Sequence, residues 1–195
     1  QLLQSALAKE AALGDSHEPG YSDAYRELGV AQNKRDRHFF PTAGEESLRR
    51  AVHLSPGDFD AWASLGGILR RAERFDDALA AYDKAVEVSE GHPYPLLMAI
   101  KLRARQAGRL ELDLQTMMAL GKAQGFRTAQ ARNEPPLDAP WCFFDLAEID
   151  LYSGKTEEAL AAARRGLDAS THDWMPATFA GALSYNSLMS GSICT

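Results

Sequence analysis

The sequence has few cysteines, no long apolar segment and no excess of basic residues, and each of these absences argues against a class of protein. Two cysteines, Cys142 and Cys194, are too few for a disulfide framework or a structural zinc site and fit a reducing compartment, with a single bridge still open. No apolar run approaches the roughly 18 residues that a membrane-spanning helix needs. With 21 basic and 27 acidic residues, a net charge of -6 disfavours nucleic acid as a partner.

The N-terminal segment also lacks the order of a signal peptide. The chain begins at Gln1, and its first basic residue, Lys9, follows the apolar pair Leu2–Leu3 instead of preceding it. We therefore expect a cytoplasmic location, no membrane partner and a chain cut from a longer protein. A content of 45% hydrophobic and 25% charged residues is ordinary for a globular protein and excludes long disorder.

What the sequence does contain is an internal repeat, clearest in residues 59–92. Its apolar and small residues recur three and four positions apart, as they do on one face of each of two successive helices. The small residues let two helix backbones approach closely, while the large ones fill the space between them. The repeat reads Trp62-x-x-Leu65-Gly66, then Phe75-x-x-Ala78-x-x-x-Tyr82-x-x-Ala85-Val86.

This pattern resembles the tetratricopeptide repeat (TPR), a helix–turn–helix unit of about 34 residues. No stretch shows the alternation of a strand, so the fold class is all-α. The resemblance implies a right-handed α-solenoid of antiparallel helix pairs, stacked as a single array over residues 1–195. The same frame predicts four units at 22–58, 59–92, 93–126 and 140–173, with half units at 1–21 and 174–195.

Two segments interrupt the repeat frame. The unit at 22–58 has three residues more than the 34 of the unit at 59–92, and the excess fits Asp36–Thr42, where Phe39-Phe40-Pro41 breaks the helix. Residues 127–139 form a predicted insert loop, which either contributes specificity or is a tolerated insertion. The last third also resembles the TPR-like domain that bacterial signalling proteins share with stress-kinase kinases, which implies a bacterial multidomain protein.

The resemblance implies an interaction scaffold that binds a peptide or a partner protein along the concave face lined by the first helices. On this face the frame predicts a basic stripe on an otherwise acidic chain, with an aromatic end beside it. The stripe consists of Lys34, Arg70, Arg71, Lys101 and Arg105, and the aromatic end of Trp141, Phe144 and Tyr152. Our hypothesis is that the stripe takes an acidic or carboxylate-terminated segment and the aromatic end an apolar side chain. The alternative is that the cations only complement helix C-termini. The predicted partner-binding residues are Arg26, Lys34, Arg70, Arg71, Tyr94, Lys101, Arg105, Trp141, Phe144, Glu148 and Tyr152.

Catalytic chemistry is not predicted. Gly154-Lys155-Thr156 looks like the end of a phosphate-binding loop, but position 149, where such a loop needs glycine, holds Ile149. The five histidines lack metal-ligand spacing, so we expect no enzyme, no metal site and no cofactor. Two alternatives to the scaffold stay open, an RNA-binding helical-repeat module and a sensor arm of a signalling protein. The exposed faces of the terminal half units are expected to favour self-association.

Overall fold

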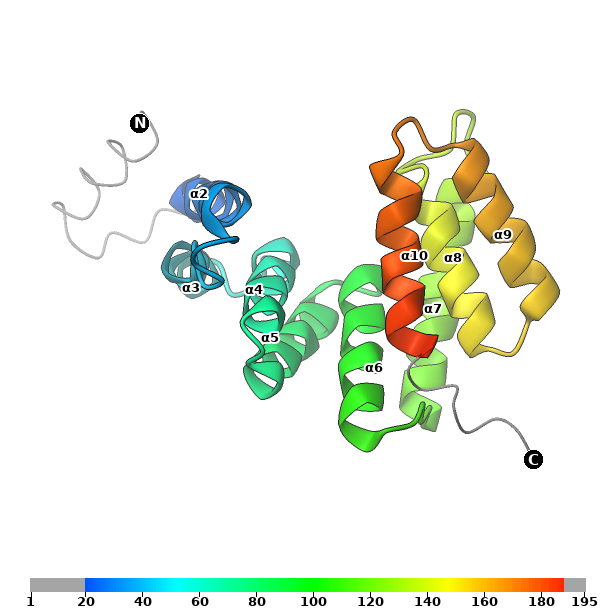
Figure 1. Cartoon of the computed structure of the whole chain (residues 1–195), viewed down its shortest axis with the longest axis horizontal. Helices are drawn as coiled ribbons and strands as arrows, with labels where there is room; N and C mark the ends of the chain where they lie inside the picture. The colour runs from blue at the N-terminus through cyan, green and yellow to red at the C-terminus, as the bar shows by residue number, and fades with distance from the viewer. Residues whose placement is uncertain (1–19, 188–195) are drawn as a thin grey trace, which may run out of the picture. The chain divides into compact units, whose positions relative to one another are not determined.

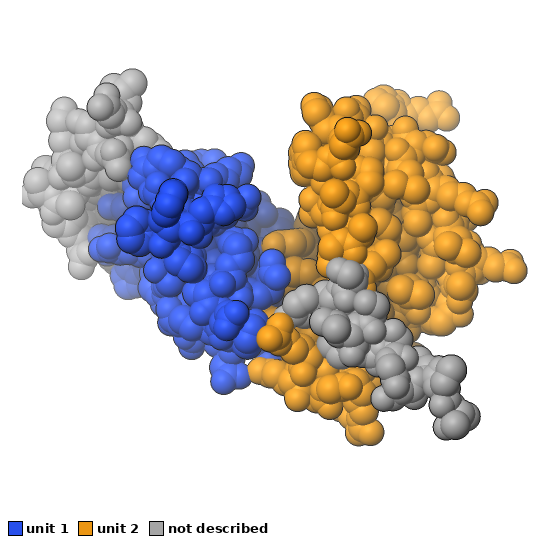
Figure 2. Space-filling model, in the orientation of Figure 1, with its two compact units in different colours: residues 1–90 blue, residues 91–195 orange. Residues whose placement is uncertain are grey.

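The computed structural model describes residues 20–187, which form nine helices and no strand (Figure 1). The predicted all-α, TPR-like fold is thereby confirmed. The chain divides into two compact units, residues 1–90 and 91–195, shown in blue and orange in Figure 2. We describe each unit by itself, and the single continuous array stays a prediction.

Unit 1 consists of two helix pairs, which occupy the predicted repeats 22–58 and 59–92. Asp58 caps the N-terminus of the third helix of the unit, which starts at Phe59, because the Asp58 side chain accepts a hydrogen bond from the backbone N–H of Ala61 at 3.0 Å. The second helix packs against both the first and the third, and the first also contacts the third, as in a stack of repeats. The helices are α2 (Gly20–Asp36), α3 (Glu45–Leu54), α4 (Phe59–Arg71) and α5 (Phe75–Val88).

The core of unit 1 depends on the close approach of α4 and α5. Leu65, Ile68 and Tyr82 are almost completely buried between the helices. A Cβ atom on Gly66 would lie 2.9 Å from the ring of Tyr82, so the ring occupies the space that only glycine leaves open. The small residue that the repeat pattern places here is therefore required by packing.

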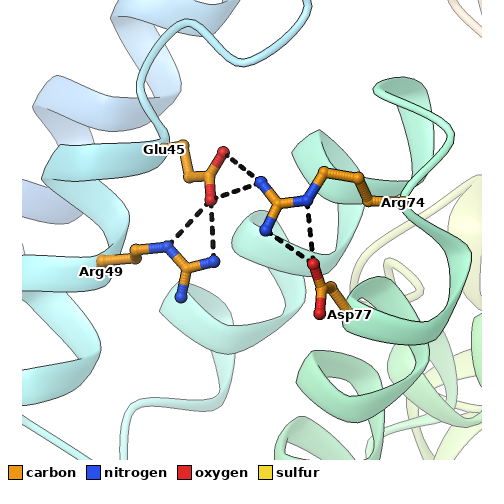
Figure 3. A network of polar contacts seen from close by, with 4 residues as sticks. All are labelled: Glu45, Arg49, Arg74 and Asp77. Carbon is orange, nitrogen blue, oxygen red and sulfur yellow. Dashed lines mark hydrogen bonds and ion pairs between the residues drawn. The ribbon is translucent and has the colours of Figure 1, made fainter.

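A network of exposed ion pairs joins the second helices of unit 1 (Figure 3). The carboxylate of Glu45, the first residue of α3, accepts hydrogen bonds from Arg49 and, at 2.9 Å, from Arg74. Arg74 also donates to Asp77 in the first turn of α5 at 2.6 Å. Because exposed pairs contribute little each, we assign this network an orienting role rather than a large share of the stability.

Unit 2 contains the predicted repeats 93–126 and 140–173 and the start of a further one. Its core is formed by Ala131, Cys142, Phe143, Leu146, Ala147 and Ala162, with Phe179 of the last helix packed against them. The helices are α6 (Pro93–Ala107), α7 (Leu114–Ala131), α8 (Trp141–Tyr152), α9 (Thr156–Asp168) and α10 (Trp174–Ser187). Helix α10 corresponds to the half unit at 174–195, whereas residues 1–19 of the other half unit lie outside the described residues.

The predicted insert loop at 127–139 is too long at its beginning. Helix α7 continues to Ala131, so the first five residues of that segment are helical and the connection starts at Arg132. The physical reason is Arg127, whose side chain points into the unit, is 2% exposed and pairs with carboxylates of α8 and of the connection. This residue is part of the packed repeat and not of an insertion.

Candidate functional site

In unit 1 the predicted binding residues lie on the first helices, α2 and α4. The guanidinium of Arg71 donates to Oδ1 of Asn33 at 2.6 Å, which fixes it across the two helices. Asn33 is buried and its amide also donates to the carbonyl of Ala43 at 3.0 Å, so its orientation is determined by the fold. The guanidinium also lies close to Gly67, four residues earlier on α4, where a Cβ atom would be 3.6 Å from Nη1 of Arg71.

Arg70, the preceding residue of α4, has a donor that the fold leaves unsatisfied. Its side chain is only partly exposed, and its Nε is buried without a hydrogen-bond partner among the residues that the structure describes. A buried donor that lacks an acceptor costs roughly 1–3 kcal/mol. Arg70 and Arg71 are thus consecutive residues at the C-terminal end of α4: Arg70 is partly exposed with a buried, unsatisfied Nε, and Arg71 is exposed and held by Asn33.

The two other predicted residues of unit 1 differ in their availability. Arg26 is bound within the chain, because its guanidinium pairs with Asp58 at 2.9 Å and with Asp23 at 3.2 Å. Since Asp58 is the cap of α4, Arg26 supports the start of that helix. Lys34, near the end of α2, is exposed to solvent.

In unit 2 the expectation of an open basic stripe is wrong at Lys101. Lys101 of α6 and Glu148 of α8 are each about 5% exposed and form an ion pair, in which Nζ lies 2.7 Å from Oε1 and 2.8 Å from Oε2. The hydroxyl of Tyr152 donates to Oε1 of Glu148 at 2.6 Å. Lys101 and Glu148 thus join α6 to α8 through a buried ion pair in which the two charges neutralise each other. Tyr152 adds a neutral hydrogen bond to the same carboxylate.

The predicted aromatic end is also partly core. Phe144 is buried, and its ring stacks on that of Phe179 in α10 with 4.4 Å between centroids, so the expectation that it is an exposed anchor is wrong. Trp141 stays partly exposed and lies 5.9 Å from Trp174, which is itself exposed. The remaining predicted residues of this unit, Tyr94 and Arg105 of α6, are exposed.

Sequence reasoning missed the buried network around Arg127. Its Nε donates to Asp145 at 2.8 Å, and its Nη1 donates to Asp138 in the α7–α8 connection at 2.6 Å. Burial raises the pKa of Asp145 to about 6, although the guanidinium opposes this rise. No sequence signal identified Arg127, because the repeat frame assigned it to an insert.

Among residues 20–187, no three His, Cys, Asp or Glu side chains are placed to hold a metal ion. None of the described helices combines the length and the apolar composition that a membrane-spanning helix requires. In the tripeptide Gly154-Lys155-Thr156, Gly154 and Lys155 lie in the turn between α8 and α9, with Gly154 at a φ of +74°, and Thr156 begins α9.

Comparison with known proteins identifies the repeat. The family model described as tetratricopeptide repeat matches residues 40–93, which include α3, α4 and α5. The chain thus contains tetratricopeptide repeats. It is similar to the cytochrome c-type biogenesis protein CycH of Rhizobium meliloti (strain 1021), with 34% identity over 128 residues. That match covers 62% of this chain and 29% of CycH, so this TPR protein spans less than a third of that relative's length.

Tetratricopeptide repeats generally mediate contacts between proteins, which gives the described faces their functional context. In this TPR protein the geometry separates two kinds of predicted site residue. Lys101, Glu148 and Phe144 are buried inside the fold, whereas Arg71 is exposed and Arg70 is partly exposed.

Proposed function

We propose that this TPR protein binds an acidic segment of a partner protein on the α2–α4 face of unit 1, through Arg70 and Arg71. The observation that carries the proposal is the exposed guanidinium of Arg71 at the end of α4, which Asn33 holds in place and which directly follows the partly exposed Arg70 along the helix. A carboxylate of the partner accepts charge-assisted hydrogen bonds at this exposed end of the helix.

Arginine suits this role for reasons of geometry and charge. Its planar guanidinium binds a carboxylate through two parallel hydrogen bonds, and such charge-assisted bonds are stronger than neutral ones. Because Asn33 already orients Arg71, less conformational entropy is lost when a ligand binds. The site therefore favours Asp, Glu or a chain-terminal carboxylate over neutral side chains.

A peptide selection tests this proposal without a known partner. Peptides are selected from a random library on the full chain, and the affinities of the selected peptides are measured for the wild type and for Arg70→Glu with Arg71→Glu. We expect selected peptides rich in Asp and Glu whose affinity falls at least tenfold, on the order of 1.4 kcal/mol, in the variant.

A control variant carries the same change of charge elsewhere. Lys84→Glu with Arg164→Glu alters exposed residues of α5 and α9, and its affinity for the selected peptides should remain close to that of the wild type. Equal losses in both variants would show a general effect of net charge and contradict the assignment. Binding of single-stranded RNA in place of peptides would support the RNA-binding alternative.

The similarity to CycH suggests a cellular process for this TPR protein. The match extends over 128 residues, whereas the family model covers only residues 40–93, so the likeness goes beyond the repeat that the model detects. We infer from the relative's name that this TPR protein takes part in cytochrome c-type biogenesis. In the source organism, deletion of the gene should lower the covalently bound haem of c-type cytochromes, and unchanged haem staining would contradict this assignment.

A further inference from the structure

The connection between α2 and α3 is longer than the packing of these helices requires. It comprises residues 37–44, whereas residues 72–74 suffice between α4 and α5 and residues 153–155 between α8 and α9. Three residues are thus enough to reverse the chain in these two pairs, and six residues, 108–113, connect α6 and α7. The extra length at 37–44, which we call the Phe loop, needs a different explanation.

The Phe loop is held in a defined conformation. The backbone N–H groups of Phe39 and Phe40 both donate to the carbonyl of Asp36 at 2.9 Å, and that of Ala43 donates to the carbonyl of Phe40. At its base, Gly44 lies so close to Gly29 of α2 that a Cβ on Gly44 would be 2.1 Å from the carbonyl oxygen of Gly29. The fold therefore presents this loop in one conformation.

Two adjacent aromatic side chains project from this ordered loop into solvent. Phe39 is 83% exposed and Phe40 is 67% exposed, although burial of a phenylalanine side chain is strongly favourable. Neither ring contributes much to the core, so the fold itself does not account for them. Exposed apolar side chains grouped in this way mark an interaction surface.

The charges beside the two rings are mainly positive. Lys34, Arg35 and Arg37 precede them, with Asp36 as the acidic residue of this stretch and an ion-pair partner of Arg35 at 2.7 Å. Lys34 and Arg37 are both exposed. A local excess of cations thus adjoins an apolar tip on a chain whose net charge is -6.

We propose that the Phe loop is a peripheral contact for the surface of an anionic lipid bilayer. Phenylalanine rings have no polar atom and enter the boundary between headgroups and acyl chains, where cations next to them meet lipid phosphates. A projecting tip of this kind requires no complementary groove in its partner. The contact also needs no spanning helix, so the absence of a long apolar run, from which no membrane partner was expected, does not oppose it.

Vesicle sedimentation with the full chain tests the contact. The wild type should bind vesicles of equal parts phosphatidylglycerol and phosphatidylcholine and should bind pure phosphatidylcholine much less. Phe39→Ser with Phe40→Ser should weaken binding at least tenfold, and Lys34→Gln with Arg37→Gln about 25-fold, from roughly fivefold for each cation lost. Since all four side chains are exposed, helix content by circular dichroism should be unchanged.

A matched control removes exposed apolar side chains from another part of the chain. Leu114→Ser with Met118→Ser changes side chains of α7 that are 74% and 62% exposed, and it should leave vesicle binding unchanged. The proposal is overturned if the wild type does not bind anionic vesicles, or if the control loses as much binding as the phenylalanine variant. It is equally overturned if vesicles cause no larger blue shift of the tryptophan emission in Phe40→Trp than in the wild type, which contains Trp62, Trp141 and Trp174.

Discussion

Removal of one charge from the buried Lys101–Glu148 pair is expected to destabilise unit 2 strongly. Both side chains are about 5% exposed, and the ammonium group contacts both carboxylate oxygens, at 2.7 and 2.8 Å. Substitution of Lys101 by Met keeps the volume but leaves the carboxylate of Glu148 buried, with the hydroxyl of Tyr152 as a neutral donor. An uncompensated buried charge of this kind costs about 3–5 kcal/mol.

Replacement of both partners should cost much less than the sum of the single changes. In Lys101→Met with Glu148→Leu no charge remains buried, and such apolar replacements of buried pairs are often close to neutral in stability. The partly exposed hydroxyl of Tyr152 can then bind water. We therefore expect a coupling energy of about 2 kcal/mol or more between the two positions.

Urea unfolding of the four proteins of this double-mutant cycle gives the coupling energy, and hydrogen exchange locates it. Loss of protection in the single variants should be concentrated in α6 and α8, with residues 59–88 of unit 1 unchanged. If Lys101→Met lowers the free energy of unfolding by less than about 1 kcal/mol, the pair is not the buried, desolvated contact described above.

Two further predictions concern packing and pH. Gly166→Ala should destabilise the protein by about 1–3 kcal/mol in thermal unfolding, because the added Cβ would lie 2.5 Å from the ring of Phe144. As a control, Gly125→Ala should be neutral or stabilising, because the space around Gly125 is open. Equal effects of the two substitutions would contradict the close packing of Gly166 on Phe144. Since the pKa of Asp145 is raised from 3.8 to about 6, the folded protein binds the carboxyl proton of Asp145 more tightly than the unfolded chain does. The stability that the protonated carboxyl adds is therefore present below pH 4 and is lost as the pH rises to about 6. Compared with Asp145→Asn, the wild type should therefore lose on the order of 2 kcal/mol between these pH values in urea titrations, and a pH-independent difference would contradict the raised pKa.

The repeat at α4 and α5 could be predicted from sequence because its determinants are local. Gly66 and Tyr82 follow the spacing of a helix pair, and the structure shows the contact that makes both necessary. The start of α4 at Phe59 also follows from nearby residues, because Asp58 caps it. Short-range periodicity and capping thus carry most of the information about this fold.

The use of individual charges could not be predicted in the same way. Lysine is usually exposed, so Lys101 was expected on the surface, but its partner Glu148 lies 47 positions away on a helix whose contact with α6 depends on the packing of the whole unit. The burial of Phe144 depends similarly on Phe179 of α10. Contacts between non-adjacent helices decide these cases, and a repeat frame does not specify them.

We have proposed that Arg70 and Arg71 bind an acidic segment of a partner protein. The affinity of library-selected peptides for the wild type and for Arg70→Glu with Arg71→Glu tests it most directly, with Lys84→Glu and Arg164→Glu as the control. We expect acidic peptides whose affinity falls at least tenfold in the first variant and stays unchanged in the control. Selected peptides without acidic residues, or an unchanged affinity in the first variant, would contradict it.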